Sequence, residues 1–175
     1  RSIILKDNKL LVFSPPKSVE YKYFSNKYDD LNSIWLEDFI DGTMISLFYD
    51  TRNNCWEIST KSTVGGNSVF FNDSIYTKND ANAVNDSKLK SYSFRDMFFE
   101  ACNFNNFNIN ILPTAYKYTF IMQHPANRIV TPNNYPTLFL LKIYEINELS
   151  SKKYNITEIN TFNFVNTPPY VLLNT

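Results

Sequence analysis

The 175-residue sequence has little of several residue types, and each shortage narrows what the protein can be. It contains one histidine, His124, and two cysteines, Cys55 and Cys102, with no Cys-x-x-Cys pair. Zinc sites are built from clusters of these residues, so we predict no metal site and two reduced thiols. No apolar run approaches the ~18 residues of a membrane-spanning helix, and no signal peptide is visible, so we predict neither membrane insertion nor secretion.

Glycine and net charge are also scarce. Gly42, Gly65 and Gly66 are the only three glycines, so each calls for a positional explanation. Lysine and arginine total 17, as do aspartate and glutamate, which leaves a net charge of zero. Proteins that bind nucleic acid usually carry a basic excess, so this balance argues against strong electrostatic binding, although it allows a local basic patch.

What the sequence does contain is typical of a folded protein. The length predicts a single domain over residues 1–175, long enough to bury a core. Apolar residues make up 43% and charged residues 19%, and aromatics reach 17%. The abundance of Asn, Lys, Ile, Tyr and Phe resembles the translation of an AT-rich genome. The chain begins with Arg1 rather than Met, so whether it is a fragment stays open.

Hydrophobic patterns predict mainly strands. Residues 2–14 form two apolar runs around Asp7-Asn8, a hairpin signal, and "PPKS" then breaks the strand. Residues 43–61 give the clearest hairpin, with the turn "DTRNN" and apolar residues on both faces. "YKYTFIMQH", "RIVT" and "TLFLLKIYEI" are further strands bounded by prolines, and "YNITEINTFNFV" is a weaker one.

One helix is predicted, over residues 91–104, with Ser93 as its cap and Asp96 in a capping-box position. Residues 72–91 are polar and are expected to be a mobile loop or insertion. The apolar residues between positions 18 and 35 follow neither a helical nor a strand periodicity. We therefore predict an α+β domain of mainly antiparallel β-sheets with few helices.

Three segments, in order, resemble the motifs of a known family: "FIDGTMISLFYD" (39–50), "WEISTKSTVGG" (56–66) and "YTFIMQHPANRIVTP" (118–132). Together they resemble the adenylation domain of phage-type RNA ligases, which are covalent nucleotidyltransferases. The likeness covers about residues 1–147 and is closest to uncharacterised ligase-like proteins of large DNA viruses. It implies a nucleotidyltransferase (adenylation-domain, ATP-grasp-like) architecture.

The same likeness shows where the chemistry is missing. In these ligases a lysine amine attacks the α-phosphate of ATP, and Phe39 stands in that lysine's place. Gln123 stands where the family has a glutamate, and so lacks the charge that favours a divalent cation. The family's later motifs are not found before Thr175. We therefore assign no catalytic residue and no metal ligand, and expect ATP and Mg²⁺ as cofactors only if the domain is active.

By resemblance, the nucleotide-binding candidates are Lys17, Asp41, Gly42, Lys61, Gln123 and Arg128. Asp41-Gly42 either orients a ligand or forms the bend that enters a strand. Arg128 either contacts a phosphate or forms an ion pair with a nearby acidic residue (Glu37, Asp38 or Glu57).

Other residues also keep two interpretations. His124 is either catalytic or a hydrogen-bonded structural residue. Ser62, Gly65 and Gly66 form either a phosphate-binding loop or a hairpin turn. The aromatic residues supply either base-stacking platforms or core and interface: Tyr21, Tyr23, Phe24, Phe70, Phe71, Phe98 and Phe99.

The favoured hypothesis is a degenerate, inactive RNA ligase-like domain of a large DNA virus, serving as a structural or interaction module in the virion. Its expected partners are other viral structural proteins or further copies of itself, with RNA as an additional candidate and no membrane. The expected location is the virion or the viral factory in the host cytoplasm. One alternative is an active ATP-dependent RNA ligase that uses a substitute nucleophile such as Lys17, or motifs outside this chain. A second alternative is a nucleotide- or RNA-binding module.

Overall fold

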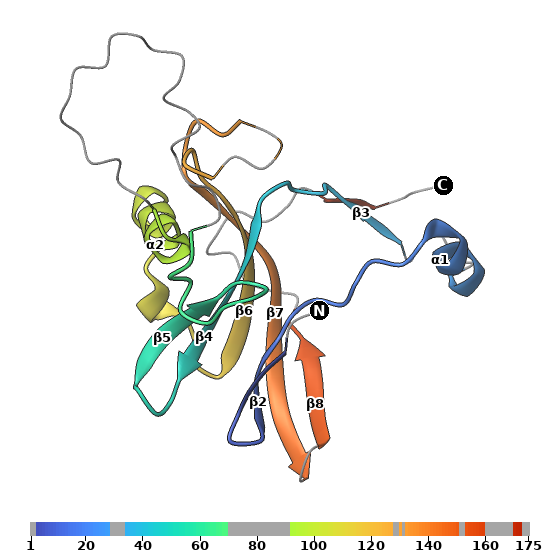
Figure 1. Cartoon of the computed structure of the whole chain (residues 1–175). Coiled ribbons are helices and arrows are strands. Elements are labelled where there is room, and N and C mark those ends of the chain that lie inside the picture. Colours follow the sequence, from blue (N-terminus) through green and yellow to red (C-terminus); the bar gives the residue numbers. More distant parts are fainter. Residues whose placement is uncertain are drawn as a thin grey trace, which may run out of the picture.

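A five-stranded antiparallel sheet forms the centre of the protein, seen in a computed structural model (Figure 1). The structure describes residues 3–28, 34–69, 92–127, 130, 132–150, 153–159 and 170–172. The strand order is β5-β4-β6-β7-β8, with β4 Thr43–Asp50, β5 Cys55–Ser59, β6 Tyr116–Gln123, β7 Thr137–Ser150 and β8 Lys153–Glu158. Every described strand pair is antiparallel, which confirms the expected α+β class.

The hairpin of β4 and β5 follows the sequence pattern closely. Residues 51–54 form the turn, and Asn54 adopts a positive φ of 49° that asparagine tolerates well. Ile45 and Leu47 on one face and Phe48 on the other are all nearly inaccessible to solvent. Both faces of β4 are therefore covered, as the apolar residues on both faces predicted. β5 ends at Ser59, two residues before the predicted limit.

Helix α2, Phe94–Phe104, packs against one face of this sheet. Ser93 and Asp96 form the predicted capping box: the Ser93 hydroxyl accepts from the Asp96 N–H, and the Asp96 carboxylate accepts from the Ser93 N–H. The helix and the sheet share one core cluster, which includes Ile45, Leu47, Ile58, Phe98, Ala101, Tyr118, Phe120, Met122 and Leu138. The short 3₁₀ helix η3, Ile109–Ile111, leads from α2 towards β6.

The predicted N-terminal hairpin covers part of the other face. It consists of β1 Ile3–Lys6 and β2 Lys9–Phe13, joined by Asp7 and Asn8 at positive φ. Phe13 meets Tyr144 of β7 edge-on at 5.4 Å between ring centroids. The Tyr154 hydroxyl of β8 accepts from the Leu10 N–H and donates to the Asn8 carbonyl. These contacts hold residues 3–13 against the late strands of the sheet.

Three short elements were not predicted. Helix α1, Tyr21–Lys27, buries none of its residues and projects away from the sheet (Figure 1). Strands β3, Trp35–Glu37, and β9, Tyr170–Leu172, pair into a separate two-stranded sheet. The predicted insertion at 72–91 and most of the predicted strand "RIVT" lie outside the described residues, as does the second half of the weaker predicted strand at 154–165, whose first half belongs to β8. In the part of the chain that the structure describes, no helix has the length and hydropathy needed to cross a membrane.

Candidate functional site

Two of the three motif segments meet where two neighbouring central strands of the sheet, β4 and β6, begin and end. Thr43 of β4 lies opposite Met122 of β6, so the start of "DGT" and the end of "FIMQ" are neighbours. Gly42 is required at this contact. A methyl group placed on its Cα would lie 2.6 Å from the Ile121 Cγ2 atom and 2.7 Å from the Met122 carbonyl oxygen. The close approach of two backbones therefore explains the first glycine.

Hydrogen bonds tie the two segments together across more than 80 residues of sequence. The Gln123 side-chain N–H donates to the Asp41 carbonyl at 2.8 Å. The Asn127 side-chain N–H donates to the Thr43 hydroxyl at 2.7 Å, and the Val130 N–H donates to the Asp41 carboxylate at 3.2 Å. We call this group, residues 41–43 with Gln123, Asn127 and Val130, the Asp41 junction. It unites three of the sequence candidates: Asp41, Gly42 and Gln123.

Phe39, at the expected lysine position, does not fill a cavity. Its side chain is 97% exposed, and the neighbouring Asp38 is also exposed. An aromatic ring that plugged a nucleotide site would be enclosed, so this arrangement is not the plugged site that an inactivated ligase could have shown. The Phe39 ring is instead exposed to solvent, two residues before Asp41, which accepts hydrogen bonds from Gln123 and Val130.

The remaining candidates are spread out or not described. Lys17 is exposed in the segment that follows β2, and Lys61 is exposed just after β5. Lys61 lines a hollow together with residues of β1. Arg128 lies outside the described residues. Of the six nucleotide-binding candidates, three are thus held together, and no group of three His, Cys, Asp or Glu side chains among the described residues is placed to hold a metal ion.

The Gly65-Gly66 segment contacts helix α2, which argues against a phosphate loop. The Arg95 N–H donates to the Gly66 carbonyl at 2.9 Å, and the Phe94 N–H donates to the Ser68 carbonyl at 3.3 Å. These are first-turn donors of the helix, which a bound phosphate would need. A methyl group on Gly66 would lie 2.8 Å from the Ile58 Cδ1 atom. The segment therefore packs against the start of α2. The alternative prediction of a hairpin turn does not include this contact with the helix.

His124 is a buried structural residue with one unusual atom. Its ring is 3% exposed, and its Nδ1 accepts from the Ala126 N–H at 3.1 Å. Its Nε2 is buried without a hydrogen bond, 3.6 Å from the Glu100 carboxylate. Burial lowers the pKa of His124, and the Glu100 carboxylate partly opposes this. Because Nδ1 accepts a hydrogen bond, the neutral form of the ring carries its proton on Nε2, and the His124 carbonyl accepts from the Asn127 N–H within the same turn.

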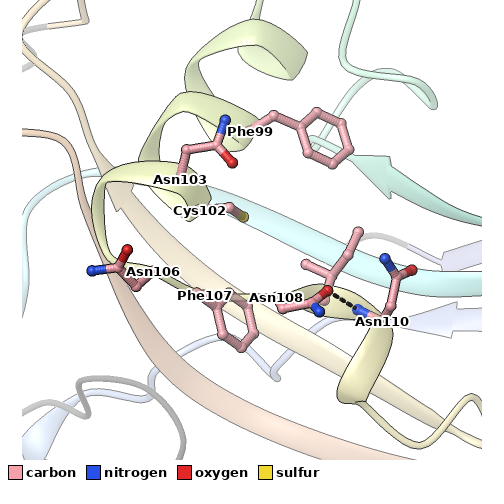
Figure 2. Close-up of a pocket in the computed structure, with 8 residues that line it drawn as sticks. Phe99, Cys102, Asn103, Asn106, Phe107, Asn108 and Asn110 are labelled. Atoms are coloured by element: carbon pink, nitrogen blue, oxygen red, sulfur yellow. Dashed lines mark hydrogen bonds between the residues drawn. The ribbon is translucent and has the colours of Figure 1, made fainter.

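A second hollow lies beside the C-terminal end of α2 (Figure 2). It has a volume of about 440 Å³, and its lining combines asparagine amides with Phe99, Phe107 and Ile109. The Asn108 side-chain oxygen accepts from the Asn110 N–H. The single thiol here, Cys102, has its pKa raised to about 12 by burial. An un-ionised thiol is a poor nucleophile, so this hollow has no reactive group.

The sequence analysis anticipated some of these residues and missed others. Both cysteines are free, as predicted. Phe98 belongs to the core, whereas Tyr21 and Tyr23 are 82% and 69% exposed, and Phe70 and Phe71 lie outside the described residues. Asn127 was missed. Its place after a His-Pro-Ala turn offered a signal, because asparagine side chains commonly form hydrogen bonds to nearby chain segments.

Comparisons with protein-family models, curated proteins and solved structures found no match.

Proposed function

We propose that this protein is a degenerate RNA ligase-like domain without nucleotidyl-transfer activity, which serves as a structural or interaction module of a large DNA virus. The proposal includes the nucleotidyltransferase architecture and a location in the virion or viral factory. It rests on the motif likeness in the sequence. One observation carries the proposal: the Gln123 side-chain amide donates a hydrogen bond to the Asp41 carbonyl and so joins two segments of the chain.

The Gln123 bond explains why an amide suits this position. The amide N–H donates to the Asp41 carbonyl, whereas an ionised glutamate has no donor and would place a charged acceptor against that oxygen. The substitution therefore removes a charge that metal chemistry needs and adds a bond that holds two strand ends together. A residue that stabilises the fold and lacks the charge for metal binding is what we expect in a domain with a structural role.

Phe39 supports the same proposal, because it stands at the position where these ligases have their nucleophilic lysine. Formation of a lysyl-adenylate needs an unprotonated amine held in line with the leaving pyrophosphate. Phe39 has no such group, so the residue at the position that the likeness assigns to the nucleophile cannot form this adduct.

The direct test is covalent labelling. Purified protein is incubated with α-³²P-labelled ATP or GTP and Mg²⁺, then separated under denaturing conditions beside an active RNA ligase. No label is expected on this protein, and a labelled band would overturn the proposal. The matched variant is Phe39→Lys combined with Gln123→Glu. Label on this variant alone would support the ligase likeness, whereas an unlabelled variant with no ATP affinity would count against it.

A second candidate function, single-stranded nucleic-acid binding, is favoured by helix α1. Tyr21 and Tyr23 are exposed there beside Lys22 and Lys27, and the Lys27 ammonium lies 5.2 Å from the Tyr28 ring centroid. Exposed rings next to cations suit base stacking and phosphate contact. Salt-dependent binding of an RNA oligonucleotide that is lost in Tyr21→Ala/Tyr23→Ala would establish it, and unchanged binding would remove this support.

A further inference from the structure

We propose that the hollow beside the C-terminal end of α2 binds a neutral sugar ring, such as one hexose unit of a glycan. This inference goes beyond the proposed function, because the likeness to ligases assigns no ligand to this part of the chain. Its basis is the lining of the hollow, which places exposed amides around an apolar floor on an ordered backbone (Figure 2).

The lining offers hydrogen-bonding groups with unused capacity. Four of its eight residues are asparagines, all of them exposed: Asn103, Asn106, Asn108 and Asn110. Asn108 uses its side-chain oxygen to accept from the Asn110 N–H. The side chains of the other three form no hydrogen bond within the part of the chain that the structure describes. An amide both donates and accepts, as a hydroxyl does, so these groups suit a ligand rich in hydroxyls.

Apolar surface lies between these amides. Phe107 is buried, whereas Phe99 and Ile109 are half-buried. In Figure 2 the free amides lie on three sides of the floor that Cys102 and Phe107 form. A sugar ring has the same two kinds of surface, because its C–H groups form an apolar face and its hydroxyls point outwards from the rim. The hollow is therefore complementary to a sugar in the arrangement of its polar and apolar groups.

The backbone that carries the amides is held in place. The Phe107 N–H donates to the Cys102 carbonyl at 2.8 Å, which closes the bend at the end of α2. The Asn105 side-chain N–H donates to the Pro136 carbonyl at 3.1 Å and ties the bend to the residue before β7. Asn106 adopts a positive φ of 52°, which asparagine tolerates well. Groups that are already positioned lose little entropy when they bind.

The charge of the lining decides between classes of ligand. None of the eight described residues that line the hollow carries a formal charge. Arg95 lies over the Phe99 ring, but its guanidinium is bound to the Glu57 carboxylate. A phosphorylated ligand would find no cation in this lining, and a divalent metal ion would find no carboxylate. These features favour a ligand without charge.

The aromatic residues favour a sugar over a nucleobase. A nucleobase is also neutral, but proteins usually hold it by stacking flat side chains on its faces. Phe107 is 8% exposed, and Arg95 already covers one face of Phe99, so neither ring offers a wide open face. The volume of about 440 Å³ is ample for one hexose ring. Because the amides are exposed and the contact is small, we expect a dissociation constant in the millimolar range.

The test is an NMR titration of the ¹⁵N-labelled full chain. Glucose, galactose, mannose and N-acetylglucosamine are each added up to about 100 mM, and adenosine and ATP up to about 10 mM. At least one sugar should shift the side-chain amide signals of Asn103, Asn106 and Asn110 with saturation, while adenosine and ATP leave them unchanged. No saturable shift with any of the four sugars, or adenosine binding at these amides, would overturn the inference.

Variants at exposed positions separate recognition from folding. Asn103→Ala and Asn110→Ala should each weaken sugar binding at least about threefold, and the double variant about tenfold. Asn147→Ala is the matched control, because Asn147 is an exposed asparagine of β7 outside the lining. It should bind the sugar as the wild type does. The backbone amide spectrum verifies that each variant is folded. Unchanged affinity in the double variant, or an equal loss in Asn147→Ala, would overturn the assignment to this hollow.

Discussion

The Gln123 side chain donates a hydrogen bond to the Asp41 carbonyl at 2.8 Å and thereby joins the start of β4 to the end of β6. This bond lies at the point where the two most ligase-like segments of the sequence meet. The position that the resemblance to RNA ligases would link to catalysis is therefore a hydrogen-bonded connection between two strands in this structure.

Replacing Gln123 with Glu should destabilise the protein by about 1–3 kcal/mol at pH 7, because the donor is lost and an ionised acceptor faces a carbonyl. The loss should shrink near pH 4, where a protonated glutamate donates again. Urea unfolding at both pH values measures the effect. Asn155→Asp makes the same amide-to-acid change at an exposed site and should be nearly neutral. An equal loss in both variants would contradict the role given to the Gln123 bond.

Gly42→Ala should cost about 1–3 kcal/mol or more, because the added methyl meets backbone that cannot move aside. Gly65→Ala is the comparison, since there the nearest atom is the flexible Asn67 amide at 3.0 Å. Its cost should be about 1–2 kcal/mol, from the positive φ of 90° alone. Thermal and urea unfolding rank the two variants, and a smaller loss at Gly42 would refute the steric explanation.

His124 should make the protein less stable in mild acid. Burial holds its folded pKa below the ordinary 6.5. The unfolded chain therefore takes up a proton first, and the free energy of unfolding falls as the pH drops from about 6.5 towards the folded pKa. His124→Leu should flatten this part of the profile. Since the chain has one histidine, its NMR titration reports the folded pKa directly, and Glu100→Gln should lower that pKa further.

The two thiols should react very differently. Cys55 is exposed, whereas Cys102 is buried and its pKa is raised to about 12. Iodoacetamide at about pH 8 should therefore modify one cysteine in the native protein and both in urea. Mass spectrometry counts the adducts. Cys55→Ser should leave the native protein unmodified, and rapid labelling of that variant would show that the α2 side of the core opens readily.

Local signals explain the parts of the fold that the sequence predicted. Alternation on both faces of residues 43–50 sufficed for the β4–β5 hairpin, and the Ser93–Asp96 pair located the start of α2. Helix α1 has seven residues and buries none, so it leaves no apolar periodicity to detect. The pairing of β3 with β9 joins three-residue strands about 135 positions apart, which no local pattern encodes.

The candidate site was predictable only where motif order carried information. The likeness to ligases named both Asp41 and Gln123 as nucleotide-binding candidates, and in the structure the two residues are hydrogen-bonded. It gave no indication of the direction of that bond, because this depends on which group of the amide faces the carbonyl. It also missed the packing of Gly66 against Arg95, which depends on a helix that begins nearly 30 residues later.

The bonds from Tyr154 to Asn8 and Leu10 have a consequence for synthesis on the ribosome. The N-terminal hairpin emerges first, but its hydroxyl partner is made about 145 residues later. Contacts of such long sequence separation form late in folding. In a nascent chain the N-terminal hairpin would therefore lack both bonds until β8 has been made, and a chain that stops before Tyr154 could not hold its first strands against the sheet in this way.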